Sequence, residues 1–221
     1  MTHFSDGVRV GRNFSLNGTA QIPGAPTSPV YVYDIVPAAL DADGICAQQT
    51  LADAGNATIN GALASNGVVT LDVPRNVVVD AAGAATAVLT VYGTDVYGNA
   101  MSEAITLNGT TAVSGKKAFK TITRVAASAA ATDFFVGTGD VFGLPFRVDS
   151  RNYTLTAWNG AFVTTGTLTA AVTTSPATTT TGDVRGTYAV PDAADGTKML
   201  TIWMFIENAD TVTGLYGVTQ A

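Results

Sequence analysis

Residues 87–107 read AVLTVYGTDVYGNAMSEAITL, and this stretch carries the pattern that decides the fold. Apolar and β-branched residues gather at 87–92 and again at 103–107, as expected of two short strands. The residues between them combine side-chain hydrogen bonding with tolerance of positive φ, and they are Gly93, Asp95, Gly98 and Asn99. The stretch therefore predicts a β-hairpin.

The same alternation of short apolar runs and turn residues recurs along the chain, while strong helical periodicity is absent. This spacing is typical of an all-β protein, and we expect an antiparallel β-sandwich with a jelly-roll-like arrangement. One segment, residues 41–55, could instead hold a helical turn capped by Asp43. The predicted strands are 30–36, 68–73, 76–79, 87–92, 103–107, 119–125, 134–136, 153–158, 162–168, 199–206 and 212–218.

Two segments stand apart from the repeating pattern. Residues 1–29 are rich in Pro, Gly and Asn, and we interpret them as an extended N-terminal arm. Residues 198–206, KMLTIWMFI, are almost continuously apolar, which favours a central strand covered on both faces or a strand at a subunit contact. The remaining residues, 30–221, are expected to form the sandwich domain, with a break into two β subdomains near residue 145 as an option.

The charge composition limits the classes of partner that this chain is expected to bind. Of its 221 residues, 11 are Lys or Arg and 17 are Asp or Glu, which gives a net charge of −6. This charge repels phosphate backbones and anionic lipid, so neither nucleic acid nor a membrane is an expected partner. Residues 1–10 lack the basic and apolar regions of an export signal, and polar residues interrupt every apolar run well before bilayer length. We therefore expect a soluble protein made inside a cell.

The residues needed for common catalytic chemistries are scarce. His3 is the single histidine and lies in the arm, so a triad that uses a histidine base is not expected. Cys46 has no basic neighbour in GICAQ, which favours an inert buried thiol. Glycine-rich phosphate loops and calcium loops fail at required positions. We expect no enzyme, no cofactor and no metal; a carboxylate-only hydrolase using Glu103 and Glu207 is the surviving catalytic alternative.

Basic residues cluster in one place within this acidic chain. Four of the eleven fall between residues 116 and 124. They either dock an acidic partner surface or keep a strand edge soluble and resistant to aggregation. The four are Lys116, Lys117, Lys120 and Arg124.

Several phrases of the sequence are similar to those of structural proteins encoded by tailed bacteriophages. They lie between residues 42 and 188, about two thirds of the chain, and they are turn-and-strand phrases without catalytic chemistry. They are ADGICAQQTLADAGNATINGALASNG (42–67), DVPR (72–75), TVYGTDVYG (90–98), AFKTI (118–122), VGTGDVFGLP (136–145) and DVRGTY (183–188).

Within that group the chain most resembles capsid cement, or decoration, proteins. The resemblance implies a virion protein that binds the outer surface of an icosahedral head, commonly as a trimer, and clamps neighbouring major capsid subunits. We expect assembly in the host cytoplasm, with the major capsid protein as partner. The candidate docking residues are Phe4, Phe14 and Leu16 in the arm and the four basic residues named above.

Two other roles are compatible with the same residues. One is a tail, baseplate or head-fibre component, which would share the composition and the trimer symmetry. The other is a carbohydrate-binding receptor module, in which the exposed aromatics would be Trp158 and Tyr97. The sequence leaves these alternatives open.

Overall fold

A computed structural model describes residues 30–149, 154–205 and 214–220. Within those residues the chain forms antiparallel strands and no helix, which confirms the all-β prediction. The strands are β1 (Val30–Ile35), β2 (Cys46–Leu51), β3 (Gly55–Asn56), β4 (Ala64–Ser65), β5 (Val68–Ala81), β6 (Val88–Thr94), β7 (Ala100–Thr106), β8 (Val113–Ala127), β9 (Ala131–Gly143), β10 (Thr154–Trp158), β11 (Ala161–Phe162), β12 (Thr167–Thr169), β13 (Thr187–Ala189) and β14 (Leu200–Phe205).

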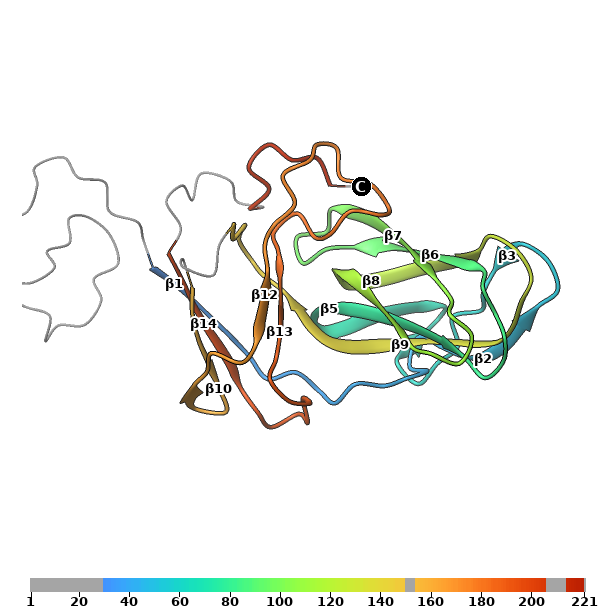
Figure 1. Cartoon of the computed structure of the whole chain (residues 1–221), viewed down its shortest axis with the longest axis horizontal. Helices are drawn as coiled ribbons and strands as arrows, with labels where there is room; N and C mark the ends of the chain where they lie inside the picture. The colour runs from blue at the N-terminus through green and yellow to red at the C-terminus, as the bar shows by residue number, and fades with distance from the viewer. Residues whose placement is uncertain (1–29, 150–153, 206–213, 221) are drawn as a thin grey trace, which may run out of the picture.

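The described strands form two sheets. The larger is a ten-stranded sheet with the order β12-β13-β9-β5-β8-β6-β7, and β2, β3 and β4 pair with it at β9, β8 and β5. It curls into a half-barrel, seen at the right of Figure 1. The smaller sheet has the order β1-β14-β10-β11 and lies at the left, with β12 and β13 between it and the half-barrel.

The predicted hairpin is present. β6 and β7 pair antiparallel from Val88↔Thr106 to Thr94↔Ala100. The turn is closed by the Asp95 carboxylate, whose Oδ1 accepts hydrogen bonds from the backbone N–H groups of Tyr97 and Asn99 at 2.8 and 2.9 Å. Gly98 adopts a φ of 82°, which glycine reaches without the steric cost that other residues meet.

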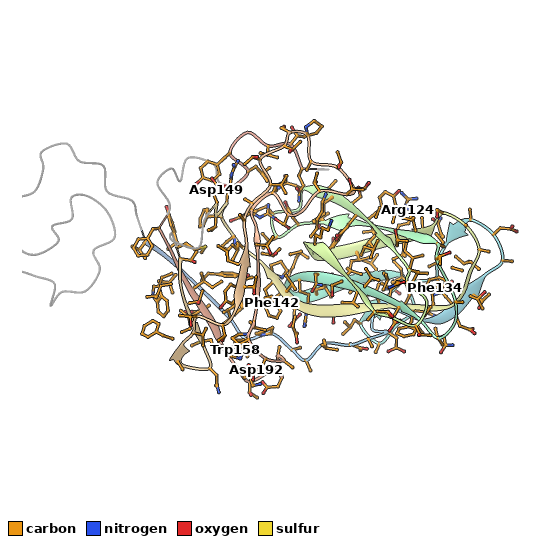
Figure 2. All side chains as sticks on the ribbon, in the orientation of Figure 1. Arg124, Phe134, Phe142, Asp149, Trp158 and Asp192 are labelled. Carbon is orange, nitrogen blue, oxygen red and sulfur yellow. The ribbon has the colours of Figure 1, made fainter. Side chains whose placement is uncertain are left out.

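Each sheet helps to enclose its own hydrophobic core. Figure 2 shows Phe134 within the half-barrel and Phe142 and Trp158 toward the smaller sheet, and all three side chains are buried. The first core is lined by β2, β5, β6, β7, β8 and β9, whereas the second lies between β13, β9 and the inner face of the smaller sheet. The apolar residues at alternate positions of the strands account for this division.

Strand pairing crosses position 145 in both directions. β13, which follows it, pairs with β9 of the larger sheet, and β1, which precedes it, pairs with β14 of the smaller one. The two larger cores of the described residues are thus distinct, but neither sheet is built from one continuous half of the sequence.

Several local predictions need correction. The helical turn expected within residues 41–55 is wrong, because Cys46–Leu51 forms β2 and pairs with β9. The predicted strand 162–168 is interrupted between β11 and β12, and residues 214–218 of the predicted strand 212–218 are not in a strand. The predicted arm, residues 1–29, lies outside the described residues, and so do Phe4, Phe14 and Leu16.

Candidate docking surface and the joint between the sheets

A buried ion pair ties the hairpin turn of the half-barrel to the segment that leads into β13. The Arg185 Nη1 atom lies 2.9 Å from Asp95 Oδ2, and both side chains are almost completely buried. Arg185 Nε also donates to the Leu144 carbonyl at 3.0 Å. On the other side of the turn, the Tyr97 hydroxyl donates to the Pro145 carbonyl at 2.8 Å. These contacts hold together segments that are distant in sequence.

Two further carboxylates are buried: Asp183 lies beside this pair, and Glu103 and Asp183 both interact with Lys117. Asp183 accepts hydrogen bonds from the backbone N–H groups of Arg185 and Ala118 at 2.9 and 3.1 Å. Glu103 accepts from the backbone N–H groups of Lys116 and Lys117 at 2.5 and 3.1 Å. Burial raises the pKa of both carboxyl groups, and this effect exceeds the opposing influence of their N–H donors and neighbouring cations.

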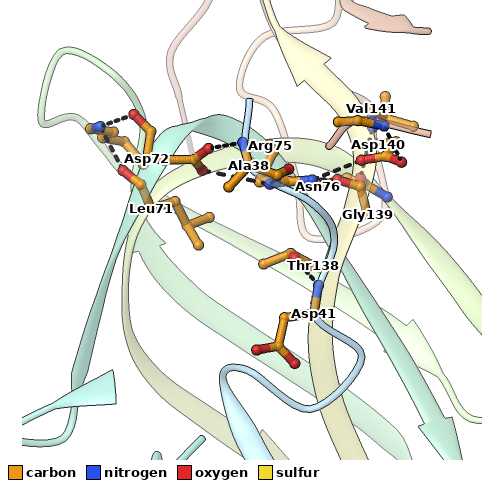
Figure 3. A network of polar contacts seen from close by, with 12 residues as sticks. Ala38, Asp41, Leu71, Asp72, Arg75, Asn76, Thr138, Gly139, Asp140 and Val141 are labelled. Carbon is orange, nitrogen blue, oxygen red and sulfur yellow. Dashed lines mark hydrogen bonds and ion pairs between the residues drawn. The ribbon is translucent and has the colours of Figure 1, made fainter. Parts of the chain in front are cut away.

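A second network joins the linker after β1 to β5 and β9, and Figure 3 shows it from close by. Buried Arg75 donates through Nε to the Gly139 carbonyl at 2.8 Å and through Nη1 to the Ala38 carbonyl at 3.0 Å. Its Nη2 pairs with Asp140 Oδ1 at 2.8 Å, and Asp140 Oδ2 in turn accepts from the Ala194 N–H at 3.2 Å. A single guanidinium therefore fixes three segments, since its planar fork offers several donors at once.

The phrases that carry the phage resemblance meet in these two networks. Arg75 of DVPR pairs with Asp140 of VGTGDVFGLP, and Arg185 of DVRGTY pairs with Asp95 of TVYGTDVYG. Asp183 of DVRGTY accepts from the N–H of Ala118, the first residue of AFKTI. Turn-and-strand phrases that are scattered in the sequence thus meet at one joint, defined here as the contacts of Arg75 and Arg185, which anchor segments that run between the half-barrel and the smaller sheet.

The basic residues predicted as a docking patch do not share one surface. Lys117 is fully buried, so its prediction as a surface docking residue is corrected. Its side chain lies on the inner side of β8, where burial lowers its pKa against the attraction of Glu103 and Asp183. Lys120 is half-buried, and its Nζ donates to the carbonyls of Leu71 and Asp72 at 2.6 and 3.0 Å. Only Lys116 and Arg124 of the four are exposed.

Arg124 packs on the surface of the ten-stranded sheet. Its guanidinium carbon lies 3.5 Å from the centre of the Tyr92 ring on the paired strand β6, within the range of a cation–π contact. Figure 2 places Arg124 on the half-barrel, away from the smaller sheet. Lys116 and Arg124 are therefore the two basic positions that remain available to an acidic partner.

An apolar surface that the sequence did not single out covers the outer side of the smaller sheet. Val32, Trp203 and Leu155 are register partners on β1, β14 and β10, so their side chains form one row across three strands. Val32 is 56% exposed and Leu155 is 48% exposed. Phe162 of β11 is 70% exposed and its ring lies 5.6 Å from that of Trp203. We call Val32, Leu155, Phe162, Trp203 and Phe205 the outward face.

The strand β14 explains why this surface exists. The sequence predicts that residues 198–206 form either a central strand covered on both faces or a strand at a subunit contact. β14 is central in its sheet, but among the described residues only one of its faces packs on a core. Leu200, Ile202 and Met204 point into the core and are fully buried, whereas Phe205 is 38% exposed. The sequence signal for this surface is that both odd and even positions of the strand are apolar. In a strand with one solvated face, apolar residues normally alternate with polar ones.

The remaining predicted chemical groups take structural positions. Trp158, a candidate for glycan stacking, is buried in the second core and its indole N–H donates to Asp192. Burial raises the pKa of the Cys46 thiol to about 12, so the thiol stays protonated near neutral pH. Among the described residues no three His, Cys, Asp or Glu side chains are grouped as metal ligands. The described part of the chain also holds no helix long and apolar enough to cross a bilayer.

Comparison of this chain with protein-family models, with curated proteins and with solved structures gave no match.

Proposed function

We propose that this chain is a decoration protein of a tailed-bacteriophage capsid. In this role it binds the outside of the shell, as a trimer, and clamps neighbouring major capsid subunits. The observation that carries the proposal is the joint. Four of the six phage-like phrases supply contacts to it, so most of the phrases that carry the resemblance meet at one place in the fold. In a fifth phrase, AFKTI, the Ala118 N–H donates to Asp183 of DVRGTY, and the sixth includes β2, which pairs with β9.

The physical character of the body suits a clamp. A protein that resists internal pressure must transmit load between its contacts, and here buried ion pairs with several hydrogen bonds anchor the segments that lead from the half-barrel to the smaller sheet. The net charge of −6 disfavours contact with packaged DNA and is compatible with an outer position. Many weak contacts, repeated over the shell, would then act together.

The exposed basic positions give this proposal a testable contact. Lys116 and Arg124 are accessible to an acidic shell surface, whereas Lys117 and Lys120 are held within the fold. The experiment adds the purified full-length protein to particles that lack it, and measures co-sedimentation and the temperature at which the particles release DNA. Saturable binding with a higher release temperature supports the proposal, and absence of binding contradicts it.

A charge-reversal variant tests whether Lys116 and Arg124 contact the shell, which is a separate question from whether the protein binds it. Lys116→Glu combined with Arg124→Glu should weaken co-sedimentation if these residues face the shell, most strongly at low salt. Lys198→Glu is the control, because Lys198 is paired with Asp192, which lies near the smaller sheet and away from Arg124 (Figure 2), and is not a proposed contact. If both variants bind like the wild type, decoration stands but these two residues are not its contacts.

A further inference from the structure

The outward face is unusual for a protein surface because its apolar side chains are adjacent. The row Val32–Trp203–Leu155 is extended by Phe162 against Trp203 and by Phe205 on the same side of β14. Contiguous apolar patches on soluble proteins mark contact sites more often than single exposed residues do. The structural question is which polypeptide covers this patch.

The size of the patch argues against a large partner. Strands of six residues are about 20 Å long, and the four strands of this sheet span about 15 Å, because strands lie about 4.8 Å apart. The product is roughly 300 Å², well below the roughly 800 Å² that each partner of a stable protein complex buries. A single extended segment covers such an area, provided that it does not have to be captured from dilute solution.

Residues 1–29 of the same chain meet that condition. They join the smaller sheet directly at Val30, which is the register partner of Phe205 on the outward face. A tethered segment has an effective concentration in the millimolar range, so a modest contact area suffices to hold it. From Leu16 to Val30 the chain can extend about 46 Å, more than twice the length of the sheet, so it can reach back across every strand.

Residues 1–29 are complementary to the outward face in two respects: they carry apolar side chains with a period of two, and their net charge is opposite to that of residues 30–221. Between residues 8 and 16, four of the five even positions are apolar: Val8, Val10, Phe14 and Leu16. A period of two places such side chains on one side of an extended chain. Residues 1–29 carry Arg9 and Arg12 against Asp6, a charge of 2 − 1 = +1, whereas residues 30–221 carry −6 − 1 = −7. Charge attraction therefore adds to the apolar contact.

The geometry points to an intramolecular cover: residues 8–16 lie extended across the outward face, with Val8, Val10, Phe14 and Leu16 against Val32, Leu155, Phe162, Trp203 and Phe205. This assignment goes beyond the proposed function and gives Phe14 and Leu16 a partner within their own chain. Shell binding then belongs to the folded body, including the region of Lys116 and Arg124.

Site-specific photo-cross-linking of the purified full-length protein tests this cover. Benzoylphenylalanine replaces Phe14 in one sample and Ser15, on the other side of the extended segment, in the matched control. The expected result is intramolecular cross-linking from position 14 to peptides containing Val32, Leu155 or Trp203, with little from position 15. Equal yields from both positions, targets elsewhere in the fold, or cross-linked dimers would overturn the proposal.

Tryptophan quenching gives a second readout that does not require a cross-linker. In a Trp158→Phe background Trp203 is the remaining tryptophan. Phe14→Ser with Leu16→Ser should remove the protection of Trp203 from acrylamide, whereas Asn13→Ser with Ser15→Asn should retain it. Unchanged quenching in a variant that melts like its parent would contradict the cover, as would protection that disappears on dilution below a dimer transition. Neither result bears on whether the protein occurs in virions.

Discussion

Arg185 and Asp95, 90 residues apart in the chain, form an ion pair of 2.9 Å inside the joint between the two sheets. Asp95 also closes the β6–β7 turn through its other carboxylate oxygen, so the same side chain shapes a local hairpin and anchors a distant segment. A turn residue that the sequence predicts for local reasons is thereby part of the tertiary structure.

Removing one partner of this pair should destabilise the protein strongly. Arg185→Met leaves the Asp95 carboxylate buried without its cation, which costs about 3–5 kcal/mol of the free energy of unfolding. The measurement is urea unfolding at pH 7. Asp149→Asn is the control, because the Asp149 side chain is 57% exposed in its pair with Arg147, and pairs with a solvent-exposed partner contribute about 0–1 kcal/mol. Similar losses for the two variants would show that the Arg185–Asp95 pair is not a principal tie of the joint.

Glu103 should make stability depend on pH. Burial raises its pKa above the ordinary value of 4.5 in the folded protein. Folding therefore binds a proton at this site, so its contribution is full below pH 4.5 and is lost as pH rises through the raised pKa. We expect the free energy of unfolding to fall over that window, with a smaller slope in Glu103→Gln, measured by urea unfolding at several pH values.

Asp192 supplies a control for this pH series, because its pKa is shifted in the opposite direction to that of Glu103. Its pKa is lowered from 3.8, first by the hydrogen bond from Lys198 and then by that from Trp158. Its contribution is present above pH 3.8 and is lost as pH falls through the lowered pKa. Asp192→Asn should therefore leave the slope above pH 4.5 as in the wild type. A Glu103→Gln slope identical to that of the wild type would refute the role given to Glu103.

Gly137 should not tolerate a methyl group. A Cβ atom built there would lie 2.1 Å from the Asp41 carbonyl oxygen, where the linker after β1 crosses β9. Gly137→Ala must displace that backbone, and overpacking of this kind costs about 1–3 kcal/mol or more. Thermal unfolding provides the measurement. Gly83→Ala, where a Cβ would meet nothing within 4 Å, should melt close to the wild type. Equal melting of both variants would place the linker elsewhere.

The two faces of the smaller sheet should respond differently to truncation. Ile202 is fully buried, and Ile202→Ala should cost about 2–5 kcal/mol through lost burial and the cavity left behind. Leu155 on the outward face is 48% exposed and lies outside the core, so Leu155→Ala should cost less, about 1–2 kcal/mol, even with the proposed cover over it. Urea unfolding of the two variants compares these losses. The opposite ranking would mean that the core lies on the other side of β14.

The all-β class and most strands could be predicted from the sequence because alternation and turn chemistry are local. The pattern predicts two strands at residues 68–73 and 76–79, and Pro74 lies between them. The structure shows one strand, β5, whose register with β8 shifts between Thr70 and Arg75. A bulge of this kind accommodates a proline that lacks a backbone N–H donor. The composition of residues 41–55 is compatible with a helical turn, but Cys46–Leu51 pairs with β9 as a strand, so tertiary pairing outweighs the local composition.

The candidate site was harder to predict because it depends on which distant segments meet. Proximity in the sequence groups Lys117 with its exposed neighbours. Successive side chains of β8 point to opposite faces, however, and Lys117 lies on the buried face near the carboxylates of Glu103 and Asp183. The outward face likewise requires β1, β10 and β14 to be neighbours, and sheet order is not encoded in the periodicity of any one strand.

The copy number of this chain in purified particles from the source that encodes it tests the central claim most directly. Quantitative mass spectrometry, calibrated against the major capsid protein, gives that number. A decoration protein should be present at a count comparable to that of the major capsid protein. A few copies per particle would instead indicate a tail, baseplate or fibre component, and absence from the particles would contradict a virion role.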